Sequence, residues 1–203
     1  MQGKKRIGPP GLVHIIPLDR KRKKAHDTAA HKNTDRSDPA GKRVEDLKRN
    51  DEQLFYRALA ELEQNPLVRR MDGFTQHRGN ATLGHCRAVA VFSFRMAQRL
   101  GWDIDEKALA TGAMLHDYYL YNRKKERIGG VRHLCNHPAL ALRNAERVAV
   151  LGRKERNIIR SHMWPMTPLQ LPRCREAWLV TLADKYCAAR EFSRGKRRKG
   201  PAV

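Results

Sequence analysis

Apolar side chains recur at steps of three and four residues through the middle of this chain, which is the spacing of one face of an α-helix. One stretch places four residues along a single side in this way: His85, Val89, Phe92 and Met96. Gly101 follows, at the point where such a helix would end. No strand-like alternation of useful length accompanies these patterns, so we predict an all-α fold, a bundle of helices.

Capping residues and prolines mark the ends of the other predicted helices. Asp51 is expected to cap an opening helix. Asp103 or Asp105 is expected to cap a later one. Pro138 suits the first turn of a helix, which would place His137 at a helix N-terminus. The two remaining helices are expected from Arg153 to about His162 and from about Pro172 to Glu191.

Both ends of the chain are basic. The chain has 42 Lys and Arg against 21 Asp and Glu, a formal net charge of +21, so its surface attracts anions. Residues 1–50 offer too little apolar surface to offset the entropy of ordering, and we expect a disordered basic arm there. Residues 193–203 are expected to form a basic tail, which leaves a helical bundle over residues 51–192.

The cysteines and the apolar segments bear on the compartment. The four cysteines form no C-x-x-C pair, and nothing upstream resembles a secretory signal. No apolar stretch is long enough to cross a bilayer. We therefore expect reduced thiols in a cytoplasmic protein that makes no contact with a membrane.

Six side chains of metal-ligand type lie in or at the ends of otherwise apolar helices: His85, His116, Asp117, His137, His162 and Asp184. A lone histidine on an apolar face is more often a hydrogen-bonded core residue. The combination favours a metal, because imidazole and carboxylate suit transition metals and a buried carboxylate is costly without a cation or another partner. For Asp184 the alternative is a salt bridge, and Lys185 is a poor partner because adjacent helical side chains diverge by about 100°.

The adjacent pair His116 and Asp117 is the most specific part of this set. Neighbouring side chains at a helix end can offer a nitrogen to one metal ion and a carboxylate to that ion and a second. Two ions about 3.5 to 4 Å apart can share an activated water and stabilise both the attacking and the leaving oxygen of a phosphoryl transfer.

These residues resemble the signature of the HD superfamily of metal-dependent phosphohydrolases, which is a histidine, a His-Asp pair and a later aspartate: His85, His116, Asp117 and Asp184. The resemblance covers about residues 80–191. His137 and His162 match the two further histidines of the six-ligand pattern.

Within the superfamily, the chain looks like the dinuclear branch that includes bacterial diadenosine tetraphosphate hydrolases, through residues 182–185. A bacterial HD subgroup is more similar still, through residues 116–121, 162–165 and 183–187. The Gly-Tyr-Pro element of cyclic-dinucleotide phosphodiesterases is absent, and no Glu-Asp pair like that of alarmone hydrolases is found. Both of those specificities are disfavoured.

The resemblance implies one metal ion held by His85, His116, Asp117 and Asp184, and a second held by the bridging Asp117 with His137 and His162. Iron or manganese is the expectation, and nothing in the six side chains excludes zinc.

A metal-activated water attacking phosphorus needs cations to orient the remaining anionic oxygens. Four basic residues follow the His-Asp pair and are expected to bind phosphate: Arg123, Lys124, Arg127 and Arg132. His77 is expected at the pocket entrance. Lys185 is expected to act on phosphate in catalysis, and His133 to donate a proton to the leaving oxygen. For each of these residues the alternative is a solvated or capping side chain.

The sequence therefore predicts a metal-dependent phosphohydrolase that cleaves a phosphoester or phosphoanhydride of a nucleotide or another small phosphorylated metabolite. The alternative is a non-enzymatic basic protein that binds nucleic acid non-specifically through its arms, or senses a ligand on an HD scaffold. The complete ligand set favours catalysis, because a decayed sensor is expected to lose at least one ligand. A third hypothesis, a mononuclear nucleotidase, predicts that His137→Ala and His162→Ala retain substantial activity.

Overall fold

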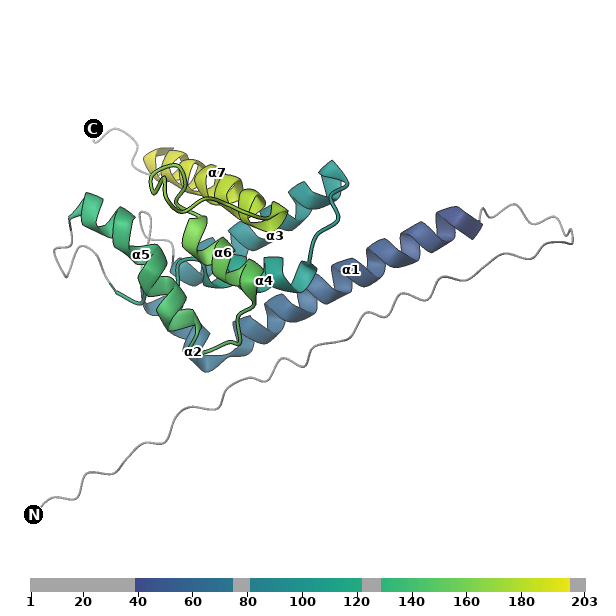
Figure 1. Cartoon of the computed structure of the whole chain (residues 1–203), viewed down its shortest axis with the longest axis horizontal. Coiled ribbons are helices and arrows are strands. Elements are labelled where there is room, and N and C mark those ends of the chain that lie inside the picture. Colours follow the sequence, from purple (N-terminus) through teal and green to yellow (C-terminus); the bar gives the residue numbers. More distant parts are fainter. Residues whose placement is uncertain (1–38, 75–80, 122–128, 198–203) are drawn as a thin grey trace, which may run out of the picture.

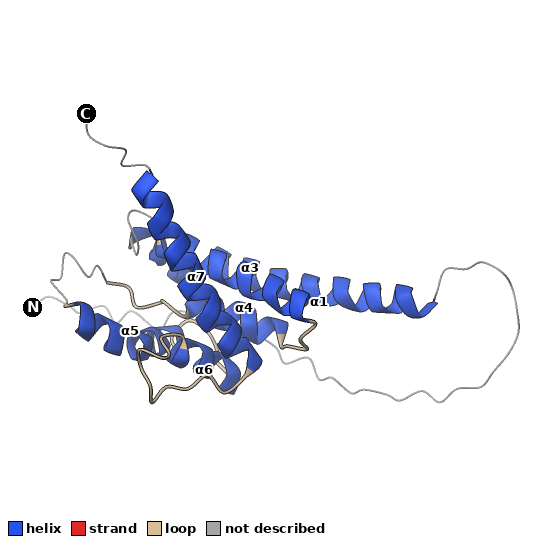
Figure 2. Cartoon of the chain, turned by 90° about the horizontal axis from the view of Figure 1, so that it is seen from above, coloured by secondary structure: helices blue, strands red, loops and turns tan. Residues whose placement is uncertain are grey.

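The computed structural model describes residues 39–74, 81–121 and 129–197 of the chain (Figure 1). Its elements, in order, are α1 (Pro39–Gln64), α2 (Pro66–Arg69), a short 3-10 helix η1 (Arg70–Gly73), α3 (Thr82–Leu100), α4 (Glu106–Leu115), α5 (Gly130–Ala145), α6 (Arg153–Ser161) and α7 (Arg175–Arg197). No β-strand occurs within these ranges, as Figure 2 shows, and the predicted all-α class is confirmed. None of these helices is both long and apolar enough to span a bilayer.

Helix α4 lies at the centre of the bundle. Every residue of α4 except Lys107 is buried, and the helix packs against α1, α3 and α6, with further contacts to α5 and α7. Asp105 caps its N-terminus, with Oδ1 accepting a hydrogen bond of 2.9 Å from the Ala108 N–H, so one of the two predicted caps is confirmed. Because helices from both halves of the chain enclose α4, the residues that follow it, His116 and Asp117, lie in the interior.

Helices α4 and α6 come unusually close at Gly112. A Cβ at this position would lie 2.6 Å from Cδ1 of Ile158 and 2.8 Å from its Cβ, so the approach depends on glycine. His116 and His162 lie one turn further along the two helices, and their ring centroids are 4.9 Å apart. The contact at Gly112 thus brings two of the predicted metal ligands together.

Helix α1 begins earlier than predicted, at Pro39, and Asp51 lies inside it, so the proposed cap at Asp51 is wrong. Residues 45–50 are exposed and, apart from Leu47, charged or polar, and they contain no glycine or proline. They extend the helix through their own helix propensity, which a prediction based on apolar surface undervalues. This part of α1 projects beyond the other helices (Figure 1). Similarly, α7 continues to Arg197, beyond the predicted end of the bundle.

Helix α5 also begins earlier than predicted. It starts at Gly130, and Pro138 lies inside it, so the proposed first-turn position of Pro138 is wrong and His137 is in mid-helix. Proline removes one backbone donor and disturbs the preceding turn, yet the helix spans it. The longer helix places His133 one turn before His137, on the same face.

Candidate metal centre

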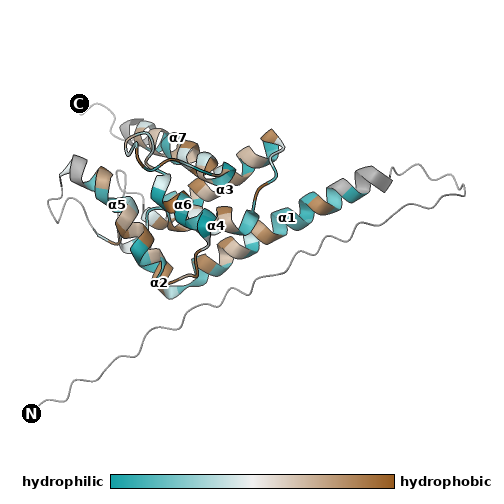
Figure 3. Cartoon of the chain, viewed as in Figure 1, coloured by the Kyte–Doolittle hydropathy of each residue, from teal (hydrophilic) through white to brown (hydrophobic). Residues whose placement is uncertain are grey.

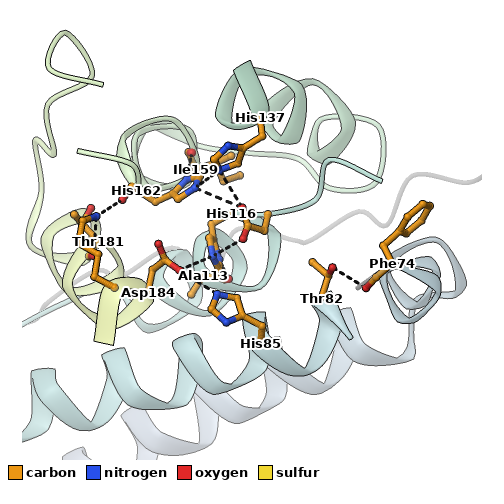
Figure 4. Close-up of polar contacts among 12 residues, drawn as sticks. Phe74, Thr82, His85, Ala113, His116, His137, Ile159, His162, Thr181 and Asp184 are labelled. Carbon is orange, nitrogen blue, oxygen red and sulfur yellow. Dashed lines mark hydrogen bonds and ion pairs between the residues drawn. The ribbon is translucent and has the colours of Figure 1, made fainter. Parts of the chain in front are cut away.

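Five helices, or their ends, bring the six predicted ligands into one buried cluster (Figure 4). Helix α3 contributes one, the C-terminal end of α4 two, α5 one, the C-terminal end of α6 one and α7 one: His85, His116, Asp117, His137, His162 and Asp184. All six are buried, and the most exposed, Asp184, has 9% of its surface accessible.

The first ligand group consists of His85, His116, Asp117 and Asp184, whose ligand atoms lie within 4.8 Å of one another. Nε2 of His85 is 3.0 Å from Oδ1 of Asp184. Nε2 of His116 lies 3.7 Å from the same oxygen and 3.4 Å from Oδ2 of Asp117. Two imidazoles and two carboxylates therefore converge on one point.

The second ligand group consists of Asp117, His137 and His162, again within 4.8 Å. Nε2 of His137 is 3.3 Å from Oδ1 of Asp117, and Nε2 of His162 is 3.5 Å from the same oxygen. The two oxygens of Asp117 thus face different groups, Oδ2 toward His116 and Oδ1 toward the other two histidines. A carboxylate in this position would bridge two cations if each group held one.

Backbone carbonyls orient three of the histidines. Nδ1 of His116 is 2.7 Å from the Ala113 oxygen, and Nδ1 of His162 is 2.8 Å from the Ile159 oxygen. Nδ1 of His137 is 2.8 Å from the oxygen of His133. Since a carbonyl only accepts, each Nδ1 carries the proton, and in the neutral ring Nε2 presents a lone pair to the cluster. Metal-binding histidines typically show this arrangement.

The Nε2 lone pairs of these histidines point toward one another and repel unless a cation lies between them. Nε2 of His137 and Nε2 of His162 are 2.9 Å apart, and with both Nδ1 atoms donating to carbonyls the two lone pairs face each other. Nε2 of His116 is buried and makes no hydrogen bond within the described part of the chain. A divalent ion in each group would accept these nitrogens and the nearby carboxylate oxygens, so the donor set fits a metal.

His85 is oriented by a carboxylate rather than by a carbonyl. Its Nδ1 lies 3.1 Å from Oε1 of Glu191, whose side chain is 13% exposed. Glu191 lies two turns after Asp184 on α7, so one face of α7 supplies both the carboxylate at Nε2 and the carboxylate at Nδ1. This role of Glu191 was not predicted, because its seven-residue spacing from Asp184 indicates a shared helix face but does not identify His85 as the partner.

The two aspartates of the cluster stay ionised. Burial by itself raises the pKa of Asp117, but the charge of His116 and the other imidazoles around it lower that pKa well below its usual range. Burial opposes ionisation of Asp184 as well, and the nearby imidazoles of His116 and His85 lower its pKa. Despite burial, the negative charge of Asp117 raises the pKa of His116 above its usual range.

His85 of the first ligand group and His162 of the second have pKa values that are shifted in opposite directions. Burial lowers the pKa of His85, but hydrogen bonds with Asp184 and Glu191 outweigh it and raise that pKa to about 10. Burial lowers the pKa of His162, and the hydrogen bond to Asp117 offsets this only in part. A metal ion in the first ligand group would therefore displace the proton of His85, whereas His162 is neutral at pH 7 without one.

Two other predicted site residues lie beside the cluster. The Lys185 ammonium group donates hydrogen bonds to the carbonyl oxygens of His162, at 3.0 Å, and Thr181, at 3.3 Å. This lysine therefore ties α7 to the end of α6. The His133 ring stacks on that of His137 with centroids 4.5 Å apart, and its Nδ1 is 2.5 Å from the Tyr121 hydroxyl.

The remaining predicted substrate-binding residues are not placed. His77, Arg123, Lys124 and Arg127 lie outside the described residues, as does the side chain of Arg132.

Comparison with known proteins supports the same family. The model of the HD domain matches residues 82–189, which is more than half of the chain and contains all six residues of the cluster. The chain therefore belongs to the HD-domain family, and the predicted superfamily is confirmed. Neither a search of curated proteins nor a search of solved structures gave a match.

Proposed function

We propose that this chain is a metal-dependent phosphohydrolase with a dinuclear centre, which cleaves a phosphoester or phosphoanhydride of a nucleotide or another small phosphorylated metabolite. The observation that carries the proposal is the position of Asp117. Its two oxygens face two separate sets of imidazole nitrogens, at 3.4 Å on one side and 3.3 and 3.5 Å on the other. A mononuclear site would not require the second set of nitrogens, those of His137 and His162.

Divalent ions in such a centre supply an activated water at neutral pH and neutralise charge on the phosphoryl oxygens. The chain's own residues fix where this happens. Asp117 spans both groups, and the backbone carbonyls behind His116, His137 and His162 keep those Nε2 atoms aimed inward. Burial of the cluster keeps bulk water away, which strengthens each electrostatic contact.

His133 is our candidate for the proton donor to the leaving oxygen. It lies one turn before His137 on α5 and stacks on that ring, so it is next to the second ligand group without belonging to it. Lys185, which follows Asp184 in the chain, donates hydrogen bonds to the carbonyl oxygens of His162 and Thr181. These bonds support a role for Lys185 in positioning the end of α6 during catalysis. The four basic residues after the His-Asp pair and His77 remain our candidates for phosphate binding.

Among possible substrates, we favour compounds with linked phosphates, as in the diadenosine tetraphosphate hydrolase branch that residues 182–185 resemble. Iron or manganese is the preferred metal, because nitrogen and oxygen ligands suit either. The four free cysteines support a reducing compartment such as the cytoplasm. The basic arms remain candidates for non-specific contacts with nucleic acid.

The test begins with metal analysis of protein purified without oxygen, followed by a screen of nucleotides, dinucleoside polyphosphates and simple phosphoesters. We expect about two metal ions per chain and phosphate or nucleotide release. Asp117→Asn should remove both ions and lower kcat/KM by on the order of 10³-fold or more, since both groups lose their shared ligand. The matched control is Asp103→Asn, an exposed aspartate before α4, which should leave both quantities unchanged.

The proposal fails if the metal-loaded protein turns over no phosphorus compound in the screen. It also fails if Asp117→Asn and Asp103→Asn behave alike.

A further inference from the structure

A basic cleft lies on the outer side of α6, away from the metal centre. It is formed by α6, the last turn of α5 and residues 169–174, which lead into α7, and it encloses about 740 Å³. That volume falls within the range typical of small-molecule sites, about 300 to 1,000 Å³. None of the six metal-centre side chains lines it. Figure 3 shows the strongly hydrophilic residues of α6.

Positive charge dominates the cleft. No acidic residue lines it, and five basic residues do: Arg153, Lys154, Arg156, Arg160 and Arg173. Two of these are neutralised, since Lys154 pairs with Glu176 at 2.6 Å and Arg156 pairs with Glu146. For the three others, no ion pair with a carboxylate is found among the described residues. Three of the arginines that line this cleft therefore carry a charge that no carboxylate in the described part of the chain compensates.

Hydrogen bonds hold the walls of the cleft in place. Asn157 of α6 donates to the Leu171 carbonyl oxygen at 3.0 Å and accepts from the Arg173 N–H at 2.7 Å. The Nε–H of Arg160 donates to Gln170 at 2.6 Å, a bond that fixes the guanidinium plane. A site whose side chains are already fixed loses less entropy when a ligand binds.

One wall of the cleft is apolar. Leu142, Leu169 and Leu171 contribute to the lining, and Leu169 is 92% exposed. An inorganic ion would leave the exposed side chains of Leu169 and Leu171 in water, whereas a ligand with a flat organic part beside its phosphates would cover them. Arginine suits the phosphates, because its planar fork binds two oxygens at once.

We propose that this cleft is a second ligand site that binds a nucleoside di- or triphosphate, with Arg153, Arg160 and Arg173 on the phosphates and the leucine wall against the base. The site is separate from the metal centre and does not rest on the hydrolase activity proposed above.

Calorimetric titration of the full-length protein with a methylene-bridged, non-hydrolysable ATP analogue tests the proposal. The double variant Arg153→Gln/Arg160→Gln should weaken binding about tenfold or more, because two charge-assisted contacts are lost. The matched control is Arg95→Gln/Arg99→Gln on the exposed side of α3, which removes the same net charge and should change affinity less than about twofold. Inorganic triphosphate should bind more weakly than the analogue, and Leu169→Ala should reduce that difference.

Several outcomes would overturn the proposal. Equal losses in the two double variants would show only general attraction to a basic protein. Binding that disappears in Asp117→Asn would belong to the metal centre. A single-stranded oligonucleotide that binds through Arg153 and Arg160, while the analogue does not bind, would make the cleft a nucleic-acid surface.

If the cleft double variant lowers the Tm, Arg173→Gln repeats the test with one substitution. Since no turnover is measured, absence of hydrolysis would not affect the result.

Discussion

The two ligand groups of the metal centre are assembled in different ways. In the second group, His137 and His162 are aimed by carbonyl oxygens of their own helices, three or four residues earlier in the chain. In the first group, His85 of α3 is aimed by Glu191 and faces Asp184, both on α7. The orientation of both histidines in the second group therefore depends on local helix geometry, as does that of His116. The orientation of His85 in the first group depends instead on how α3 packs against α7.

The groups also differ in charge. The first contains two carboxylates and the second only Asp117, which they share. A divalent ion gains more from two negative ligands than from one, so we expect the first ligand group to bind its ion more tightly. Substitutions in one ligand group at a time test whether the two groups bind their ions independently.

Among substitutions that change only one ligand group, the largest effect is expected from removing a histidine. His137→Ala should lose the ion of the second ligand group, keep that of the first and lower kcat by on the order of 10²-fold or more. His85→Ala should reduce the ion of the first group instead. Metal content per chain and turnover of the best substrate measure both. Substantial activity in His137→Ala and in His162→Ala would indicate a mononuclear enzyme.

A smaller effect is expected at Glu191. Glu191→Gln keeps the size of the side chain but weakens its hold on Nδ1 of His85, and loss of such an outer partner typically costs about 10 to 100-fold in metal affinity. Competition with a chelator should show this loss for the first ligand group only. Equal weakening of both ions would contradict the separation drawn above.

Glu176→Gln is the matched control, because it makes the same change on the same helix, away from the cluster. Glu176 accepts hydrogen bonds from the Asp105 N–H and from Lys154, and despite burial the bond from Lys154 lowers its pKa below 4.5. Its stabilisation is therefore present above pH 4.5 and is lost as the pH falls through the lowered value. The variant should lose roughly 1.5 to 3 kcal/mol at pH 7, and less in acid, with unchanged metal affinity.

The smallest effect on the centre is expected from Gly112→Ala. The added Cβ would meet Ile158 and force α6 away from α4, which should lower the Tm and weaken the ion that His162 helps to hold. Gly84→Ala is the control, since no atom lies within 4 Å of a Cβ there and the position is exposed on α3. Alanine at that site should stabilise the protein by about 0.5 to 1 kcal/mol. Similar Tm changes in the two variants would contradict the packing argument.

Sequence reasoning found the side chains at the cluster because each one interrupts an apolar helical pattern. A buried His85 or Asp184 stands out against its neighbours. Glu191 did not stand out, because it occurs at the charged end of α7, where a carboxylate is ordinary. Only the structure shows that α7 carries it across to His85.

The errors at the helix starts have a similar origin. Leu47 is the only apolar residue among residues 45–50, and Pro138 is a common marker of a first turn, so both cues suggested a later start than the true one. Helix propensity and packing overrode these cues. The basic cleft could not be predicted either, since it depends on residues 169–174 folding back over α6.

The imidazoles of His116 and His162 also terminate helices. They follow the last residues of α4 and α6, and their Nδ1–H groups satisfy the carbonyl oxygens of Ala113 and Ile159, which belong to the final turns. Carbonyls in a last turn lack the amide partner four residues on. In each helix, one hydrogen bond therefore caps the C-terminus and selects the tautomer that exposes Nε2. The contact that limits fraying of α4 and α6 is thus the same contact that leaves Nε2 able to bind an ion.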